Sequence, residues 1–225
     1  MSHVERFGAL VPSSNTTVED ELAQYLRLPS SESVRFHIGR LDYNTRISVS
    51  YQDYCQEICA KVVPAMTTLE KVKDIRSIGF FCTTCSLYLS DPLFSSIDNP
   101  ISAIAKTCFA SGIVSPLVIT PYTDEITSRI LSKLPFHSIV SSVNINKLTA
   151  SELGGMNLDT LLEITKNNFD HTKHDSTIIL CTNLPSLHLA KVIRYFTSKP
   201  FISSNLAMIS AMQNIAIDRI IEQMP

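Results

Sequence analysis

Two cysteines, Cys82 and Cys85, follow a strongly apolar run in the stretch FFCTTCSL. Their CxxC spacing occurs in zinc sites and in disulfide oxidoreductases. A third cysteine, Cys181, also ends an apolar run and precedes a threonine, in ILCTNLPSL. A thiol acts as a nucleophile or base only when its thiolate is stabilised, and a strand end that runs into a helix N-terminus supplies free backbone N–H groups. We therefore expect both Cys-Thr turns to activate their first thiol.

An internal repeat relates the surroundings of Cys82 and Cys181. In each half of the chain an apolar strand runs into a polar turn, PSSNTTVEDE or PYTDEI, and a later strand ends in Cys-Thr. Such self-similarity indicates two units of similar structure. Ligands of open parallel sheets bind outside the carboxyl ends of the strands. If the two units face each other about a pseudo-twofold axis, the two cysteines lie on opposite sides of one small ligand.

Short apolar, β-branched runs alternate with longer amphipathic stretches along the chain. The predicted strands are 6–11, 33–40, 75–82, 114–120, 137–143 and 176–182. The predicted helices are 17–27, 49–72, 98–111, 123–133, 157–169, 185–197 and 205–223. This alternation predicts an α/β fold with two similar parallel-sheet lobes, helices on both faces and a pseudo-twofold relation. We assign residues 1–110 and 206–225 to the first lobe and 111–205 to the second.

Composition and charge restrict the partners. The 225 residues are 44% hydrophobic and 18% charged, which is typical of a folded globular protein. The formal net charge is −2 and no basic tract is present, so we expect no nucleic-acid partner. The N-terminus does not resemble a signal peptide and no long apolar stretch occurs, so we expect no membrane partner and a cytoplasmic location with reduced cysteines. A homodimer is the default expectation.

Two thiols on opposite faces of one carbon can catalyse reactions without a cofactor. One thiol can remove a proton while the other delivers one, which gives racemisation. Alternatively one thiolate adds to an activated double bond, the new single bond rotates, and the other thiol handles the proton, which gives cis–trans isomerisation. Either reaction develops enolate-like charge, which neutral donors can stabilise. The candidate donors are Ser14, Asn15, Thr83, Tyr122, Thr182 and Asn183.

Each candidate also has a plainer interpretation. We expect Ser14 and Thr17 to cap a helix, whereas we expect Asn15 and Tyr122 to contact the substrate. Cys85 is interpreted as a packed bystander. A zinc site built from Cys55, Cys59, Cys82 and Cys85 is disfavoured, because the first two lie one turn apart in a predicted helix rather than in a metal-binding turn. A thioredoxin-type function is disfavoured because nothing beyond the CxxC matches it.

At these residues the sequence resembles the aspartate/glutamate racemase superfamily, above all its maleate cis–trans isomerase and arylmalonate decarboxylase branch. The motifs are GALVPSSNTTVEDEL, FFCTTCSL, VITPYTDEI, ILCTNLPSL and KPFISSNLA, which cover nearly the whole chain. The resemblance implies a two-lobed fold with the site between the lobes. It implies that Cys82 adds to the substrate double bond, that Cys181 is the acid/base partner, and that Asn15 and Tyr122 bind carboxylate. Asn205, after Ser204, falls on a motif near the site.

Differences between the branches narrow the expected activity. Arylmalonate decarboxylases usually have a small residue where Cys82 stands, and glutamate racemases have His where Asn183 stands. A carboxylate-binding Asn of maleate isomerases matches Ser151 in LTASELGG, which leaves room for a dicarboxylate related to maleate. The resemblance thus implies a cofactor-independent, metal-free isomerase of a small dicarboxylic acid. An aspartate-type racemase, an arylmalonate-type decarboxylase and a small-acid-binding protein without turnover stay open as alternatives.

Overall fold

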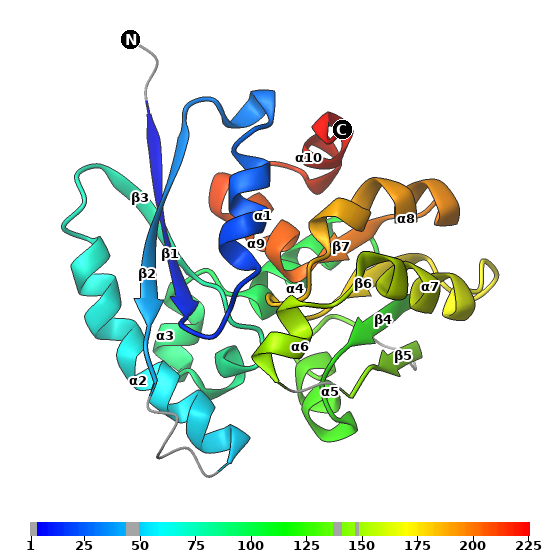
Figure 1. Ribbon diagram of the computed structural model, residues 1–225, viewed down its shortest axis with the longest axis horizontal. Coiled ribbons are helices and arrows are strands. Elements are labelled where there is room, and N and C mark those ends of the chain that lie inside the picture. Colours follow the sequence, from blue (N-terminus) through cyan, green and yellow to red (C-terminus); the bar gives the residue numbers. More distant parts are fainter. Residues whose placement is uncertain (1–3, 44–49, 137–140, 147–148) are drawn as a thin grey trace.

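Two parallel sheets form the centre of the computed structural model, which describes residues 4–43, 50–136, 141–146 and 149–225 (Figure 1). The first sheet has the order β2-β1-β3, with β1 Glu5–Pro12, β2 Val34–Leu41 and β3 Ile75–Phe80. The second has the order β5-β4-β6-β7, with β4 Pro116–Thr120, β5 Ser141–Asn144, β6 Ser176–Ile179 and β7 Phe201–Ser203. Every strand pair is parallel. The predicted α/β class with two parallel sheets is confirmed, and β2-β1-β3 has the same arrangement as β5-β4-β6.

Helices occupy most of the predicted stretches. They are α1 Val18–Tyr25, α2 Tyr51–Leu69, α3 Asp91–Ser96, α4 Pro100–Ala110, α5 Asp124–Leu131, α6 Ala150–Gly154, α7 Leu158–Asn168, α8 Ala190–Thr197, α9 Ser204–Gln213 and α10 Ile217–Gln223. Short 3-10 turns lie at Pro29–Ser31, Cys85–Tyr88 and Leu187–Leu189. None of the helices in the described ranges is long and apolar enough to cross a membrane.

Some predicted boundaries are wrong. The single helix predicted at 205–223 is two helices, because Asn214 takes the left-handed conformation, with φ 55° and ψ 45°, and ends α9. Strand β7 and the short helices α3 and α6 were not predicted from the sequence. Of the strand predicted at 137–143, the part from Ser141 on belongs to β5, and 137–140 lie outside the described residues.

Strand β1 lies between two hydrophobic cores, because successive side chains of a strand point to opposite faces. Phe7, Ala9 and Val11 are fully buried in a core that includes residues of α1 and α9. Leu10 lies in the other core with residues of α2, among them Ile58. Helices therefore cover both faces of the first sheet.

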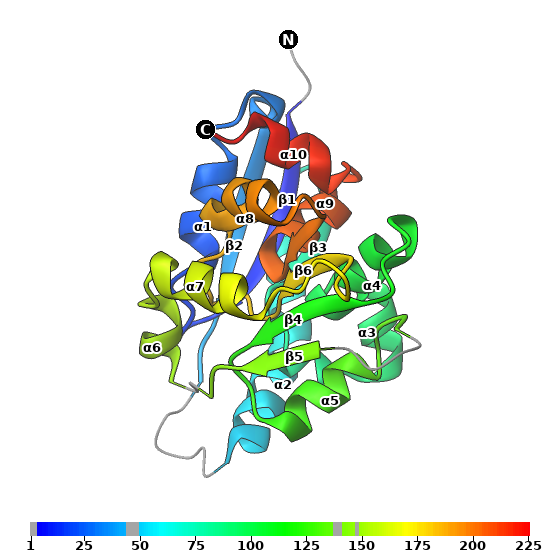
Figure 2. The ribbon, with the colours of Figure 1, turned by 90° about the vertical axis from the view of Figure 1, so that its right-hand side faces the viewer.

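Helix α9 joins the two sheets. It follows β7 of the second sheet but packs against α4 and β3, next to the first sheet (Figure 2). The larger core accordingly contains residues from both sheets, such as Phe7 of β1 and Ile178 of β6. The assignment of 206–225 to the first lobe, with the rest of the proposed lobe boundaries, stays a prediction.

The carboxyl ends of four strands carry the residues that the motifs single out. Asn15 follows β1, Cys82 follows β3, Tyr122 follows β4 and Cys181 follows β6. The parallel arrangement thus gives each of these residues the same place relative to its strand, at the end where α/β proteins bind ligands.

The burial of α2 gives a first prediction. Ile58 is fully buried between α2 and β1, so Ile58→Ala should lower the free energy of unfolding by about 2–5 kcal/mol. Val63 lies on the same helix with 55% of its surface exposed, so Val63→Ala should change it by less than about 1 kcal/mol. Urea unfolding of both variants measures the difference. Equal losses would contradict the assignment of the buried face of α2.

Candidate active site

A cavity of about 320 Å³ lies where the carboxyl ends of the two sheets meet, and Cys82 and Cys181 both line it. Their exposed fractions are 8% and 5%, so each side chain is largely buried. Among the described residues that line the cavity, none is Asp, Glu, Lys, Arg or His. All six donors predicted from the sequence line it as well: Ser14, Asn15, Thr83, Tyr122, Thr182 and Asn183.

Reciprocal hydrogen bonds tie the two Cys-Thr turns together. Thr182, next to Cys181, donates its hydroxyl to the carbonyl of Phe81, 3.0 Å away and next to Cys82. In the other direction, Thr83 donates its hydroxyl to Oγ of Ser204, 3.1 Å away. The same Oγ accepts the backbone N–H of Cys181 at 3.0 Å. Ser204, which follows β7, thus links the turn of Cys82 to the backbone of Cys181, and Thr182 links the turn of Cys181 to the residue before Cys82.

Asn15 has two roles in the polar turn after β1. Its Oδ1 accepts the backbone N–H groups of Thr17 and Val18, 2.9 and 3.0 Å away, and so caps α1. Its Nδ2 donates to Oγ1 of Thr182 across the cavity, at 3.2 Å. The predicted cap roles of Ser14 and Thr17 are therefore wrong, because neither side chain caps α1. The Ser14 hydroxyl lies 3.4 Å from that of Tyr54, and the Thr17 hydroxyl donates to a carbonyl of the other sheet's loop.

Asn183 connects three segments around the cavity. Its Oδ1 accepts the backbone N–H of Thr16 at 2.9 Å, and its Nδ2 donates to the carbonyl of Ala150 at 2.9 Å. These contacts hold the start of α6 over the site. Both polar atoms of this side chain are thereby engaged by protein groups, so its position is fixed before any ligand binds.

Two candidates from the sequence do not reach the cavity. Ser151 is exposed on α6. The residues in and next to α6 that line the cavity are Thr149, Ala150 and Leu153. Asn205 is buried behind the site, where its Nδ2 donates to the carbonyl of Thr182 at 2.9 Å and to Glu21 at 2.7 Å. Ser151 therefore does not line the cavity, and Asn205 supports the Cys181 loop from behind it.

The sequence reasoning missed a wall of tyrosines. Tyr43, Tyr51 and Tyr54 line the cavity from the segment that leads into α2 and from its first turn. The rings of Tyr43 and Tyr54 meet edge to face with centroids 4.9 Å apart, and the Tyr51 hydroxyl contacts that of Thr84. The clustering of three of the chain's seven tyrosines within this short stretch was the available signal.

Hydrogen bonds stabilise the thiolate of Cys82. The Cys85 thiol, the Thr84 hydroxyl and the backbone N–H groups of both residues lower the pKa of Cys82 below its ordinary value, although burial opposes them. Cys85 is fully buried, as expected of a packed residue, but it has the largest of the effects that lower the pKa of Cys82, which the interpretation as a bystander did not include. Among the residues that the structure describes, no group of His, Cys, Asp and Glu is arranged to hold a metal ion.

Cys181 has the opposite character. Burial raises the pKa of its thiol to about 11, although the Tyr122 hydroxyl and the backbone N–H groups of Asn183 and Leu184 donate hydrogen bonds that lower it. Burial also raises the pKa of Tyr122 well above its usual range, so this hydroxyl keeps its proton. The expectation that both Cys-Thr turns activate their thiol is wrong for Cys181. The two walls of the cavity therefore differ, because hydrogen bonds lower the pKa of the Cys82 thiol whereas burial raises that of Cys181.

The backbone of Cys181 is strained. Its φ of 149° lies where residues with a side chain are rarely found, and such strain persists only where the surroundings enforce it. Here the backbone N–H is held by Ser204 and the carbonyl accepts from Leu184 at 3.3 Å. Strain of this kind clusters at functional sites, and it occurs here at one of the two cavity cysteines.

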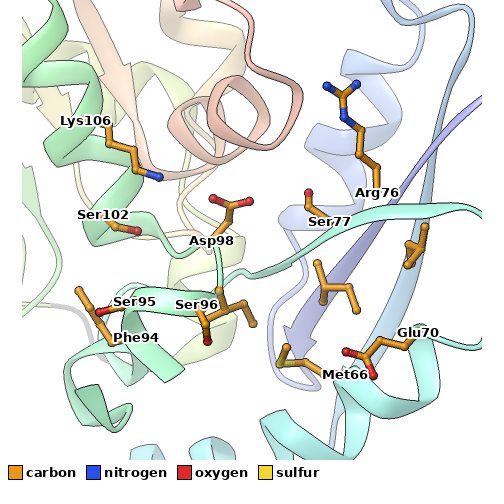
Figure 3. Close-up of a pocket in the computed structure, with 13 residues that line it drawn as sticks. Met66, Glu70, Arg76, Ser77, Phe94, Ser95, Ser96, Asp98, Ser102 and Lys106 are labelled. Carbon is orange, nitrogen blue, oxygen red and sulfur yellow. The ribbon is translucent and has the colours of Figure 1, made fainter. Parts of the chain in front are cut away.

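A larger hollow, of about 570 Å³, lies beside β3 and near α2, α3 and α4 (Figure 3). Its polar lining includes Glu70, Arg76, Asp98 and Lys106, and Lys106 points toward Asp98 (Figure 3). None of the residues predicted for the site lines it. Since it holds charges of both signs and no nucleophilic thiol, its size does not make it the better candidate for catalysis.

A buried glutamate supports the loop after Cys181. Glu21 of α1 accepts the backbone N–H groups of Ser186 and Leu187, 2.6 and 2.7 Å away, and the Nδ2 of Asn205. Burial raises its pKa from 4.5 to about 7, while these three donors hold it down. The carboxylate thus joins α1 of the first sheet to the segment that follows Cys181.

Comparisons with known proteins agree with this geometry. The chain is 25% identical over 223 residues to a maleate isomerase from Alcaligenes faecalis, covering 88% of this chain and 86% of that one. A mutant Nocardia farcinica maleate cis-trans isomerase with a covalently bound succinylcysteine intermediate has the same fold, with a TM-score of 0.80, 18% identity and coverage of 94% of both chains. A liganded double mutant of arylmalonate decarboxylase gives a TM-score of 0.76 at 17% identity, covering 95% of this chain and 93% of that one.

No protein-family model matches the chain. The similarities match the maleate isomerase and arylmalonate decarboxylase branch that the motifs indicate, and they confirm the predicted fold class.

The unequal thiols predict unequal alkylation. Cys82 should react with iodoacetamide below the usual pH range of a thiol, whereas Cys181 and the buried Cys108, whose pKa burial raises to about 12, should react slowly until the pH is high. Mass spectrometry of the labelled peptides against pH measures the three rates. Equal rates for Cys82 and Cys108 would contradict the assignment of a thiolate to Cys82.

Glu21 predicts a pH dependence of stability. Its pKa of about 7 in the folded state exceeds the ordinary 4.5, so the folded state binds more protons between these values. The free energy of unfolding should therefore fall as the pH rises from about 4.5 to 7, by on the order of 3 kcal/mol. Glu21→Gln should remove this slope, while Glu19→Gln, a half-exposed neighbour on α1, should keep it. The free energy of unfolding, measured in urea at each pH, would refute the assignment to Glu21 if it fell equally with pH in wild type and in Glu21→Gln.

Proposed function

We propose that this chain, a homologue of maleate isomerases, is a cofactor-independent cis–trans isomerase of a small dicarboxylic acid such as maleate. In this proposal Cys82 is the nucleophile and Cys181 the acid/base. The observation that carries it is that two cysteines from corresponding strand ends line one cavity, with the pKa of Cys82 lowered and the pKa of Cys181 raised. Addition to a double bond needs this combination of one nucleophile and one acid.

In the first step the Cys82 thiolate forms a C–S bond with one carbon of the double bond. The π electrons move to the neighbouring carbon and its carboxylate, as an enediolate. The S–H bond of Cys181 then breaks, and its proton goes to that carbon. The product is a succinyl thioether and a Cys181 thiolate. A succinylcysteine of this kind is bound in the Nocardia farcinica isomerase, which supports the step.

In the second step the new C–C single bond rotates. The Cys181 thiolate takes a proton back from carbon, the double bond re-forms in the trans geometry, and the Cys82 thiolate leaves. The hydrogen bond from Tyr122 and the backbone N–H groups of Asn183 and Leu184 stabilise the Cys181 thiolate between the two proton transfers. Electrons and protons balance within the two cysteines and the substrate, so the proposed cycle uses no cofactor.

The neutral lining favours a dicarboxylate over an amino acid. Carboxylates meet hydroxyl, amide and backbone N–H donors from Ser14, Asn15, Thr83, Tyr122 and the Cys181 loop. An α-ammonium group would call for an acidic partner, and the described part of the lining offers none. This favours the isomerase over the aspartate-type racemase. The free state of all six cysteines fits the proposed cytoplasmic location, and a homodimer stays a prediction.

The proposal predicts turnover of maleate. Proton NMR in D₂O should show fumarate accumulating from maleate with wild-type protein, and no faster than background with Cys82→Ser or Cys181→Ser, because a hydroxyl replaces neither the thiolate nor the thiol acid. Cys108→Ala, which removes a buried thiol away from the cavity, is the control and should keep the wild-type rate.

The same experiment against pH tests the two roles. The rate should rise as Cys82 ionises, below the ordinary pKa of a thiol, and fall as the pH approaches 11 and Cys181 loses its proton. Substituted maleates, aspartate, glutamate and arylmalonates form the substrate panel. If the protein binds these acids but turns over none of them, the proposal of an enzyme is wrong and the small-acid-binding alternative is supported.

A further inference from the structure

A buried carboxylate lies behind the turn that contains Cys181. Glu21 and Asn205 are each 1% exposed, and neither lines the cavity. One carboxylate oxygen of Glu21, Oε1, accepts the backbone N–H groups of Ser186 and Leu187 at 2.6 and 2.7 Å. The other, Oε2, accepts Nδ2 of Asn205 at 2.7 Å. None of the ion pairs that the described residues form includes Glu21, so N–H donors alone stabilise its charge.

Asn205 connects Glu21 to the turn itself. Its Nδ2 also donates to the carbonyl of Thr182, the residue after Cys181, at 2.9 Å. An amide nitrogen has two protons, so one goes to each acceptor. The Oδ1 of Asn205 is buried and has no hydrogen-bond partner among the described residues. The two acceptors on its nitrogen side therefore determine which way this amide is turned.

The turn of Cys181 needs such support because its backbone is strained. The φ of 149° at Cys181 persists only where neighbouring contacts enforce it. Ser204 accepts the N–H of Cys181 at 3.0 Å, and the next residue, Asn205, holds the carbonyl that follows the thiol. Glu21 holds two N–H groups farther along the same loop. Contacts from the start of α9 and from α1 thus fix the loop from Cys181 to Leu187.

Stability does not explain a carboxylate at this place. Burial raises the pKa of Glu21 to about 7 in spite of its three donors, so the ionised form is less favourable in the fold than in water. Glutamine has nearly the same shape and avoids burying a charge. Its amide, however, cannot accept on both sides, because its nitrogen would face Nδ2 of Asn205, donor against donor. Asn205 must then turn its oxygen toward the glutamine, which leaves the carbonyl of Thr182 without its donor.

We infer that Glu21 is a positioning residue, which acts through Asn205 to hold the turn that presents the Cys181 thiol to the cavity. The inference rests on the proposed function, because Cys181 is the acid of that reaction. It also concerns the place of one sulfur atom, which can be measured without any substrate.

The first test compares Glu21→Gln with wild type at pH 8, where the wild-type carboxyl is mostly ionised. The kcat for maleate should fall about tenfold, the effect of one lost hydrogen bond to the acid turn, while KM changes less than about twofold. Asp20→Asn removes an exposed carboxylate from the adjacent position of α1 and should keep the wild-type kcat.

A second variant tests the route through Asn205. Asn205→Ala removes the donor to Thr182 while Glu21 keeps its backbone partners, so kcat should fall by a similar factor. If Glu21 acts through Asn205, the double variant Glu21→Gln/Asn205→Ala should be no slower than Asn205→Ala alone. Losses that multiply in the double variant would show that Glu21 acts by another route, and would overturn the inference.

Alkylation by iodoacetamide at pH 8, followed by mass spectrometry, gives a measurement without substrate. In Glu21→Gln the rate at Cys181 should rise several-fold, because the released turn exposes its thiol. The rates at Cys82 and at the buried Cys108 should change far less. Equal increases at all three cysteines would indicate a general loosening of the fold and would overturn the inference.

A folded Glu21→Gln with the wild-type kcat and the wild-type labelling rate at Cys181 would also overturn it. If Glu21→Gln does not fold, Asn205→Ala carries the same two measurements, and wild-type values there would have the same consequence. Failure of the proposed function is distinguishable: wild type would then turn over no acid in the panel, while labelling of Cys181 would still rise in Glu21→Gln.

Discussion

The whole site depends on the hydrogen bonds that cross between the carboxyl ends of the two sheets. Thr182 holds the carbonyl before Cys82, and Ser204 joins Thr83 to the backbone N–H of Cys181. A buried donor or acceptor left without its partner costs about 1–3 kcal/mol, so neither Cys-Thr turn can shift alone without that loss. Two sulfur atoms from distant parts of the chain thereby keep a fixed relation to one cavity. Glu21 and Asn205 extend the same connection away from the cavity.

The repeat in the fold is not a repeat in the chemistry. Cys82 and Cys181 both follow the carboxyl end of a strand and precede a threonine, yet their pKa values move in opposite directions. The difference lies in the donors rather than in burial, since both are buried. A helical turn and a second thiol face Cys82, whereas Cys181 has a strained backbone and the hydroxyl of a tyrosine. One scaffold therefore places two cysteines with opposite pKa shifts at corresponding positions, as the proposed roles of nucleophile and acid require.

The sequence is informative where a single residue type determines a local structure. Apolar β-branched runs indicated the core strands, and Asn15 in its polar turn indicated both a helix start and the cavity. The sequence is less informative where tertiary contacts determine the position of a side chain or the end of a helix. Nothing local distinguishes Tyr54 on a buried helical face from Tyr54 in a cavity wall, or shows that α9 ends at Asn214. The helical turn that Ser86 closes onto the Cys82 carbonyl is one that the CxxC spacing permits but does not require.

Neutral donors suit the proposed reaction, in which the Cys82 thiolate attacks a doubly charged acid. Nucleophilicity falls as the pKa of a thiol falls, so a strong cationic partner would give more thiolate but a poorer nucleophile. A cation beside Cys82 would also pair with the carboxylates of the substrate and compete with their placement over the sulfur. Hydrogen bonds from Cys85, Thr84 and the backbone lower the pKa more gently and add no charge to the cavity.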